Sequence, residues 1–154
     1  MGKYDGQFIW DYKHFPPEFW AREKDSPLKG SHLLWMDGER VPGAFYMETH
    51  WFWELTAPMP SMTPEGIPQS HHHDFDEIQG FFGSRKEDPW DLGAEIEFYI
   101  DGECHTFTKS CFLFIPRGQE HLPMTIKRVW APFMWLTGGN GKTLGWNGAA
   151  PSGQ

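Results

Sequence analysis

The sequence predicts an all-β domain built from many short strands. Its 154 residues suffice for one ordinary domain with its own core. Aromatic residues make up 17% of the chain, which argues against disorder because disordered chains lack the apolar surface that offsets chain entropy. The 17 glycines and 13 prolines favour turns over long helices. Short strands separated by turn signals are typical of a β-sandwich or β-barrel.

A period of two begins at Ala44, so residues 44–55 are predicted to form a long strand. A proline-rich loop is expected over 56–70 and a polar loop over 83–93. Asp101-Gly102 is a two-residue hairpin signal. Further strands are predicted at 75–82, 95–100, 103–108, 111–115, 124–129 and 133–137.

The two ends of the chain lack this alternation. Residues 1–43 are predicted to be an N-terminal arm that packs on the barrel or on a second subunit. Pro16-Pro17, followed by residues 18–23, predicts one short helix in the arm, because proline suits the first helical turn. The barrel is expected over 44–137, and the glycine-rich residues 138–154 are expected to be a flexible tail.

The charge of the chain excludes some partners. Thirteen Lys and Arg residues stand against 21 Asp and Glu residues, for a net charge of −8. Such an acidic chain is not expected to bind nucleic acid or an anionic membrane surface. No run approaches the roughly 18 apolar residues of a membrane span. Residues 1–10 have no apolar signal-peptide core, so the expected location is cytoplasmic.

The stretch from Ser70 to Glu77 carries the clearest chemical signal. In an extended segment, His71, His73 and Glu77 have the same parity and point to one side, while His72 points away. Two imidazoles and one carboxylate suit Mn, Fe, Co, Ni, Cu or Zn. The alternative explanation of this sequence is a solvent-exposed loop that happens to contain several histidines.

A second segment places His121 just after Pro116-Arg117-Gly118. Proline fixes φ and glycine permits positive φ, so this turn can aim the following side chain inward. The pattern His71-x-His73-x-x-x-Glu77, followed by Pro116-x-Gly118-x-x-His121, resembles the two motifs of the cupin superfamily. The resemblance covers about residues 44–137.

The second motif departs from the family pattern in two places. Ser110 stands where the family usually has a glycine, and Thr125 where it often has an asparagine. Both positions concern turns and packing more than ligands. The resemblance therefore implies a cupin-type double-stranded β-helix, or jelly-roll barrel. It also implies one divalent metal (Fe, Mn, Ni, Zn, Co or Cu) on His71, His73, Glu77 and His121.

The residues around such a metal would determine which substrate binds and which reaction takes place. Gln79 and Phe81 continue the parity of Glu77, and neighbouring strands offer further rings. An aromatic lining suits a flat or apolar small organic substrate. The candidates for the pocket wall are Gln79, Phe81, Trp51, Trp53, Phe133 and Trp135, with His50 and Phe52 as the alternative to the two tryptophans.

The leading functional hypothesis is a metal-dependent enzyme acting on a small aromatic or carbonyl-containing molecule. A dioxygenase and a Lewis-acid isomerase or lyase both fit, and the second needs a side chain that shuttles protons. Candidates for that role are Glu77, His50 and Glu120, together with Glu48 and Glu54 on the strand of His50. A non-catalytic module that binds small molecules is the alternative, since fold alone does not determine function.

A homodimer is also expected. Aromatic residues recur throughout residues 1–43 and would leave an exposed apolar surface on a bare monomer. Such patches usually mark an interface. The sequence thus predicts that the arm contributes to a contact between two copies of the chain.

Overall fold

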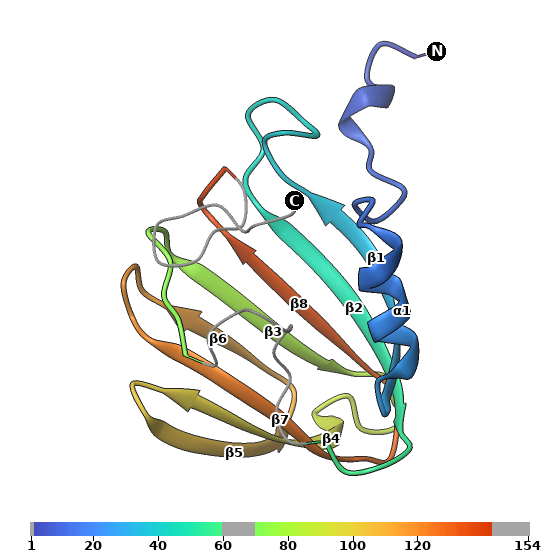
Figure 1. The fold of residues 1–154 in the computed structure, drawn as a ribbon, viewed down its shortest axis with the longest axis vertical. Coiled ribbons are helices and arrows are strands. Elements are labelled where there is room, and N and C mark those ends of the chain that lie inside the picture. The colour runs from blue at the N-terminus through green and yellow to red at the C-terminus, as the bar shows by residue number, and fades with distance from the viewer. Residues whose placement is uncertain (1, 60–69, 143–154) are drawn as a thin grey trace.

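Two antiparallel sheets form the body of the structure (Figure 1). The computed structural model describes residues 2–59 and 70–142. One sheet has five strands in the order β1-β2-β8-β3-β6, and the other has three in the order β5-β4-β7. The elements are a 3₁₀ turn (Asp5–Gln7), α1 (Pro17–Asp25), β1 (Leu28–Met36), β2 (Met47–Leu55), β3 (Glu77–Gly83), β4 (Asp91–Ile100), β5 (Glu103–Lys109), β6 (Cys111–Ile115), β7 (His121–Val129) and β8 (Phe133–Gly139).

The alternation in the sequence corresponds to the two faces of the five-stranded sheet. On β2, Glu48, His50 and Phe52 are buried, while Trp53 is exposed. On β3, Glu77, Gln79 and Phe81 are likewise buried, whereas Ile78 is exposed. Side chains alternate between faces along a strand, so one face lines the interior between the sheets. The predicted all-β fold class is confirmed.

Apolar side chains from both sheets meet in this interior. Phe81 and Phe133 of the larger sheet and Leu92, Ile96 and Met124 of the smaller sheet are completely or almost completely buried. The Phe81 ring meets the Phe98 ring edge to face, with centroids 6.5 Å apart. The core therefore lies between the sheets, as in a sandwich whose inner faces interdigitate.

The boundary between arm and barrel, predicted at residue 43, lies earlier in the structure, because β1 precedes residue 43 and belongs to the barrel. Residues 28–36 pair with the whole length of β2 and belong to the sheet. Their pairing register shifts between Lys29 and Gly30 and again between His32 and Leu34. Each bulge shifts the phase of the alternation, which is why no period of two is visible in this part of the sequence. Only the residues before Leu28 form an arm.

The arm packs against its own barrel. Helix α1 begins at Pro17, as predicted, and extends two residues beyond the predicted end at residue 23. In Figure 1 it lies alongside β1. The ring of Tyr12 contacts those of His32, Trp35 and His50 at centroid distances of 4.8, 5.6 and 5.6 Å. Of the two predicted positions for the arm, the structure shows the one on the barrel.

Smaller differences occur at strand ends. The polar loop predicted over 83–93 ends earlier, because β4 begins at Asp91 and continues past Gly93, whose φ is +80°. Residues 71–76 are not a regular strand, and β3 begins only at Glu77. Of the predicted tail, 138 and 139 belong to β8, and residues 143–154 lie outside the described residues. No helix in the described ranges has the length and apolar character needed to cross a membrane.

Candidate metal centre

The turn after β6 fastens the two sequence motifs together. Gly118 has a φ of +79°, which favours glycine. Its N–H donates to the carbonyl of His73, 2.9 Å away, and the Arg117 N–H donates to Asp76 Oδ1, also at 2.9 Å. The Pro-x-Gly segment therefore ties its own backbone to the residues around His73, which is how it places the following histidine.

His71 and His121 are held opposite each other by an isolated antiparallel bridge. The His71 N–H donates to the His121 carbonyl at 3.0 Å, and the reverse bond measures 2.9 Å. This pairing, rather than a regular strand through residues 71–76, brings the histidines onto one side. The result expected from strand parity is thus reached by a different local structure.

The four predicted ligands converge in the interior. His71, His73, His121 and Glu77 are each only 1–4% exposed. The ligand atoms of the three histidines lie within 4.8 Å of one another. Glu77 Oε2 lies 2.9 Å from Nε2 of His73 and 3.0 Å from Nε2 of His121.

These distances fit a shared cation. Two donors bound at right angles about 2.1 Å from one ion are roughly 3.0 Å apart. Moreover, neither Glu77 Oε2 nor His121 Nε2 makes a hydrogen bond of normal geometry, although both are buried. Buried polar atoms normally have a hydrogen-bond partner. Two such atoms that lie close together without a well-formed hydrogen bond are expected where both would bind the same metal ion. The residues therefore fit one divalent transition metal with nitrogen and oxygen ligands.

Neighbouring groups orient two of these ligands. The ring nitrogen Nδ1 of His121 lies 3.0 Å from the Gln119 carbonyl, which can only accept, so Nδ1 carries the proton and Nε2 keeps its lone pair. The Gln79 amide donates to Glu77 Oε1 at 3.0 Å, which leaves Oε2 facing the histidines. Gln79 is in turn held by the Trp135 indole N–H at 3.0 Å.

The protonation states also suit metal binding. Burial lowers the pKa of His71 to about 3, and the neighbouring His121 and His73 add to the effect. Burial would raise the pKa of Glu77, but contacts with His121 and His73 outweigh it and lower this pKa to about 2. For His121, burial favours the neutral ring, yet Glu77 raises its pKa overall. A bound cation would replace that proton as the partner of Glu77.

His72 and Glu120 lie outside the centre. The His72 Nδ1 donates to Glu120 Oε1 at 2.7 Å, and both side chains are substantially exposed. Glu120 also accepts from the Ser70 hydroxyl at 2.9 Å. His72 thus points away from the ligands, as its parity predicts, and Glu120 lies at the surface rather than among them.

The candidate pocket residues divide between the two faces. Gln79, Phe81, Phe133 and Trp135 are on the inner face, where Phe81 and Phe133 are part of the core. Trp51 and Trp53 stack on each other on the outer face, with ring centroids 5.4 Å apart. The inward placement of Trp51 and Trp53 is therefore wrong. The alternative pair, His50 and Phe52, occupies the inner face because β2 has the opposite phase.

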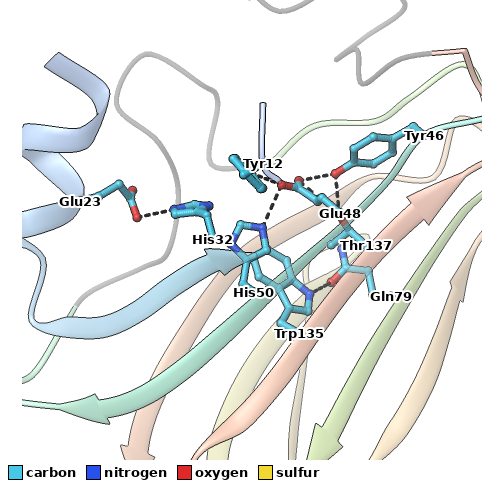
Figure 2. Close-up of polar contacts among 9 residues, drawn as sticks. All are labelled: Tyr12, Glu23, His32, Tyr46, Glu48, His50, Gln79, Trp135 and Thr137. Carbon is cyan, nitrogen blue, oxygen red and sulfur yellow. Dashed lines mark hydrogen bonds and ion pairs between the residues drawn. The ribbon is translucent and has the colours of Figure 1, made fainter. Parts of the chain in front are cut away.

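A second group of possible ligands lies on the same inner face, where β1 and β2 meet the arm (Figure 2). Ligand atoms of His32, Glu48 and His50 lie within 4.8 Å of one another. Here, however, the carboxylate already has its partners. Tyr12 and Tyr46 donate to Glu48, and the His50 Nε2 donates to it at 2.9 Å. The contacts of Glu48 therefore hold this part of the barrel to the arm. We use the name Glu48 network for the residues gathered here: Tyr12, His32, Tyr46, Glu48, His50 and Thr137.

Sequence reasoning missed most of the Glu48 network. Tyr46 shares the parity of Glu48 and His50, which is a usable signal. Tyr12 and Thr137 come from distant parts of the chain, and nothing local marks them. The Thr137 hydroxyl reaches Glu48 Oε1 at 3.3 Å because β8 pairs with β2 at this position.

Gln79 provides a test of how Glu77 is held. We expect Gln79→Ala to weaken metal binding by about 10- to 100-fold, because the hydrogen bond that orients the carboxylate is lost. Affinity is measured by competition with a chromophoric chelator. Gln119→Ala is the matched control, since the Gln119 side chain bonds to Asp101 and only its backbone carbonyl contacts His121. Equal affinities in the two variants would show that Gln79 does not position the ligand.

Comparison with known proteins shows similarity of fold alone. No family model and no curated protein matches the sequence. Oxalate oxidase in complex with the substrate analogue glycolate aligns with a TM-score of 0.52 and 14% identity, over 92% of this chain and 63% of that one. An RmlC-like cupin from Shewanella frigidimarina aligns with a TM-score of 0.42 and 11% identity, over 86% and 96%. This chain thus spans less than two thirds of oxalate oxidase.

Two antiparallel sheets that enclose a cluster of three histidines and one glutamate define a small jelly-roll barrel with a candidate metal centre. The predicted cupin-type jelly-roll fold is confirmed, since the two sheets align with oxalate oxidase over 92% of this chain.

Proposed function

We propose that the chain is a metal-dependent enzyme that acts on a small aromatic or carbonyl-containing molecule. One divalent transition metal would be held by His71, His73, Glu77 and His121. The observation that carries the proposal is the convergence of Glu77 Oε2 on the Nε2 atoms of His73 and His121 at 2.9 and 3.0 Å. When bound, the metal would supply Lewis acidity or a redox couple.

The surroundings of the centre support an apolar or flat substrate. The Phe75 ring stacks on His73 with centroids 4.8 Å apart. Ile115, the cross-strand partner of Glu77, is almost completely buried. Such walls exclude water and strengthen polar interactions inside the barrel.

A dioxygenase is the first candidate within this class. Of the side chains that adjoin the ligands, Phe75, Gln79 and Ile115 have no proton that titrates near neutral pH. A dioxygenase would need no side chain that shuttles protons, whereas an isomerase or a lyase would need one. These residues therefore favour oxygen chemistry.

A Lewis-acid isomerase or lyase is the second candidate, and His50 is the observation that favours it. Its imidazole is paired with the buried carboxylate of Glu48 at 2.9 Å, an arrangement typical of a general base. The ring also contacts Trp135 at a centroid distance of 5.4 Å, and Trp135 bonds to Gln79. His50 would then take or return the substrate proton.

The test uses apoprotein loaded separately with Fe(II), Mn(II), Ni(II) or Zn(II). Oxygen uptake is followed with catechols and 1,3-diketones, and isomerisation or elimination is followed anaerobically. We expect substrate-dependent oxygen uptake by the iron form and none by His121→Ala. Anaerobic turnover by the zinc form, lost in His50→Ala, would favour the second candidate. If the metal-loaded protein binds these compounds without converting them, the result would favour a non-catalytic binding module.

A further inference from the structure

The chain leaves β8 through a short segment that lies beside the candidate metal centre. This segment, which we call the Gly-Asn-Gly segment, consists of Gly139, Asn140 and Gly141. Gly139 lies opposite Glu77 in the register of β8 and β3. Tyr46 holds the segment in place, because its N–H donates to the Gly141 carbonyl and its carbonyl accepts from the Gly139 N–H, both at 2.9 Å.

The asparagine of this segment bonds to Asp76 at three points. The Asp76 N–H donates to Asn140 Oδ1 at 3.0 Å, the Asn140 N–H donates to the Asp76 carbonyl at 3.2 Å, and Asn140 Nδ2 donates to Asp76 Oδ2 at 3.3 Å. Asp76 directly precedes Glu77, and its Oδ1 accepts from the Arg117 N–H of the Pro-x-Gly turn. Asp76 therefore connects both segments that carry the predicted ligands to the chain beyond β8.

The two glycines leave room for the ring of Phe75. A Cβ atom at Gly139 or at Gly141 would lie only 2.5 Å from this ring. Carbon atoms normally pack about 3.5–4.0 Å apart, so a side chain at either position would displace the ring. Neither glycine has a positive φ, so these positions require space rather than an unusual backbone conformation.

The position of Phe75 matters because its ring contacts a predicted ligand. The ring stacks on the imidazole of His73 with an interplanar angle of 15°. Phe75 is only 4% exposed, so a displaced ring would press on its neighbours. The glycines therefore determine where this ring lies, and the ring in turn supports His73.

We propose that the Gly-Asn-Gly segment positions two ligands of the metal centre. Its asparagine fixes the backbone before Glu77 through Asp76, and its glycines fix the imidazole of His73 through Phe75. Ligands that are locked by their neighbours bind a metal more tightly than ligands that are free to move. This inference rests on the proposed function, since it assigns the segment to the same metal centre.

The substitution Gly141→Ala tests the contact with Phe75. We expect it to weaken Zn(II) binding by about 10-fold or more, as the loss of support for a ligand does. Affinity is measured by competition with a chromophoric chelator. Gly6→Ala is the matched control with wild-type affinity, because a Cβ atom at Gly6 would meet nothing within 4 Å. Circular dichroism verifies that each variant is folded.

A second readout needs no metal. In the metal-free protein, the NMR signals of the His73 ring should shift in Gly141→Ala, because the aromatic ring that stacks on this imidazole moves. The same signals should stay in place in Gly6→Ala.

Asn140→Ala is the second variant and tests the other half of the segment. Asn140 is exposed, and the substitution removes its side-chain bonds to Asp76 without placing an atom in the interior. We expect Zn(II) affinity to fall by about 5-fold, since neutral hydrogen bonds that hold the backbone before Glu77 are lost.

Wild-type affinity in a folded Gly141→Ala variant would overturn the proposal, and so would unchanged His73 signals. If Gly141→Ala does not fold, wild-type affinity in Asn140→Ala would overturn it, because the segment would then serve folding alone. A wild type that binds no metal would contradict the proposed function, whereas the His73 signals of the metal-free protein would still decide whether the segment positions this side chain.

Discussion

Replacing His121 with alanine is expected to abolish metal binding. The wild type should carry about one ion per chain and the variant less than about a tenth, because a deep interior ligand is lost and the Glu77 carboxylate loses its partner. His121 is 1% exposed, and its Nε2 lies 3.0 Å from Glu77 Oε2. Elemental analysis of tag-free protein measures the metal content. The alanine keeps the backbone bridge to His71, so the local fold should survive.

His72→Ala is the matched control, because His72 lies between two ligands in the sequence yet bonds to Glu120 at the surface. Its metal content should equal that of the wild type. Added metal should also raise the melting temperature of the wild type and of His72→Ala, but not of His121→Ala, since a ligand stabilises only the state that binds it. Equal loss of metal in both variants would contradict the assignment of His121 as a ligand and of His72 as a surface residue.

The second large effect is expected at Glu48. Glu48→Gln should lower the free energy of unfolding by about 3 kcal/mol, because a buried carboxylate is removed from its partners. The amide replaces only one of the two oxygens, so it faces either the Tyr46 donor at Oε1 or the Tyr12 and His50 donors at Oε2, and it cannot accept from them. Urea unfolding measures the difference.

Glu54→Gln is the control for this substitution. Glu54 lies on the same strand but is exposed, so the change should stay within about 0.5 kcal/mol. Equal stability of the two variants would contradict the role of the Glu48 network. Glu48 bonds to Tyr12, so we also expect Glu48→Gln to increase proteolysis of the arm more than Glu54→Gln does.

The contribution of Glu48 also has a defined pH dependence. Burial would raise the pKa of Glu48, but the charge and hydrogen bond of His50 outweigh it and hold the pKa below its usual 4.5. A lowered pKa means that the stabilisation is fully present above pH 4.5 and is lost as the pH falls through the lowered value. The stability difference between wild type and Glu48→Gln should therefore be constant near neutral pH and shrink below pH 4.5.

The convergence of the four candidate ligands could be predicted from local patterns. Parity on β3 places Glu77, Gln79 and Phe81 together, and the Pro116-x-Gly118 turn directs His121 to them. The same reasoning failed for Trp51 and Trp53, because alternation shows that two faces exist but not which one is inner. On β2 both faces carry rings, so hydrophobicity could not choose between them.

The sequence by itself determined the all-β class, the ends of α1 to within two residues, and the four residues that converge on the candidate metal centre. Each of these depends on residues close together in the chain or on a recognisable motif. Only the tertiary structure decided that β1 joins the sheet, that Tyr12 and Thr137 meet Glu48, and that Trp51 and Trp53 lie on the outer face of β2. These features depend on bulges, on strand order and on which sheet covers which face. They arise from contacts between distant segments, whose pairing is set by packing of the whole domain rather than by local preference.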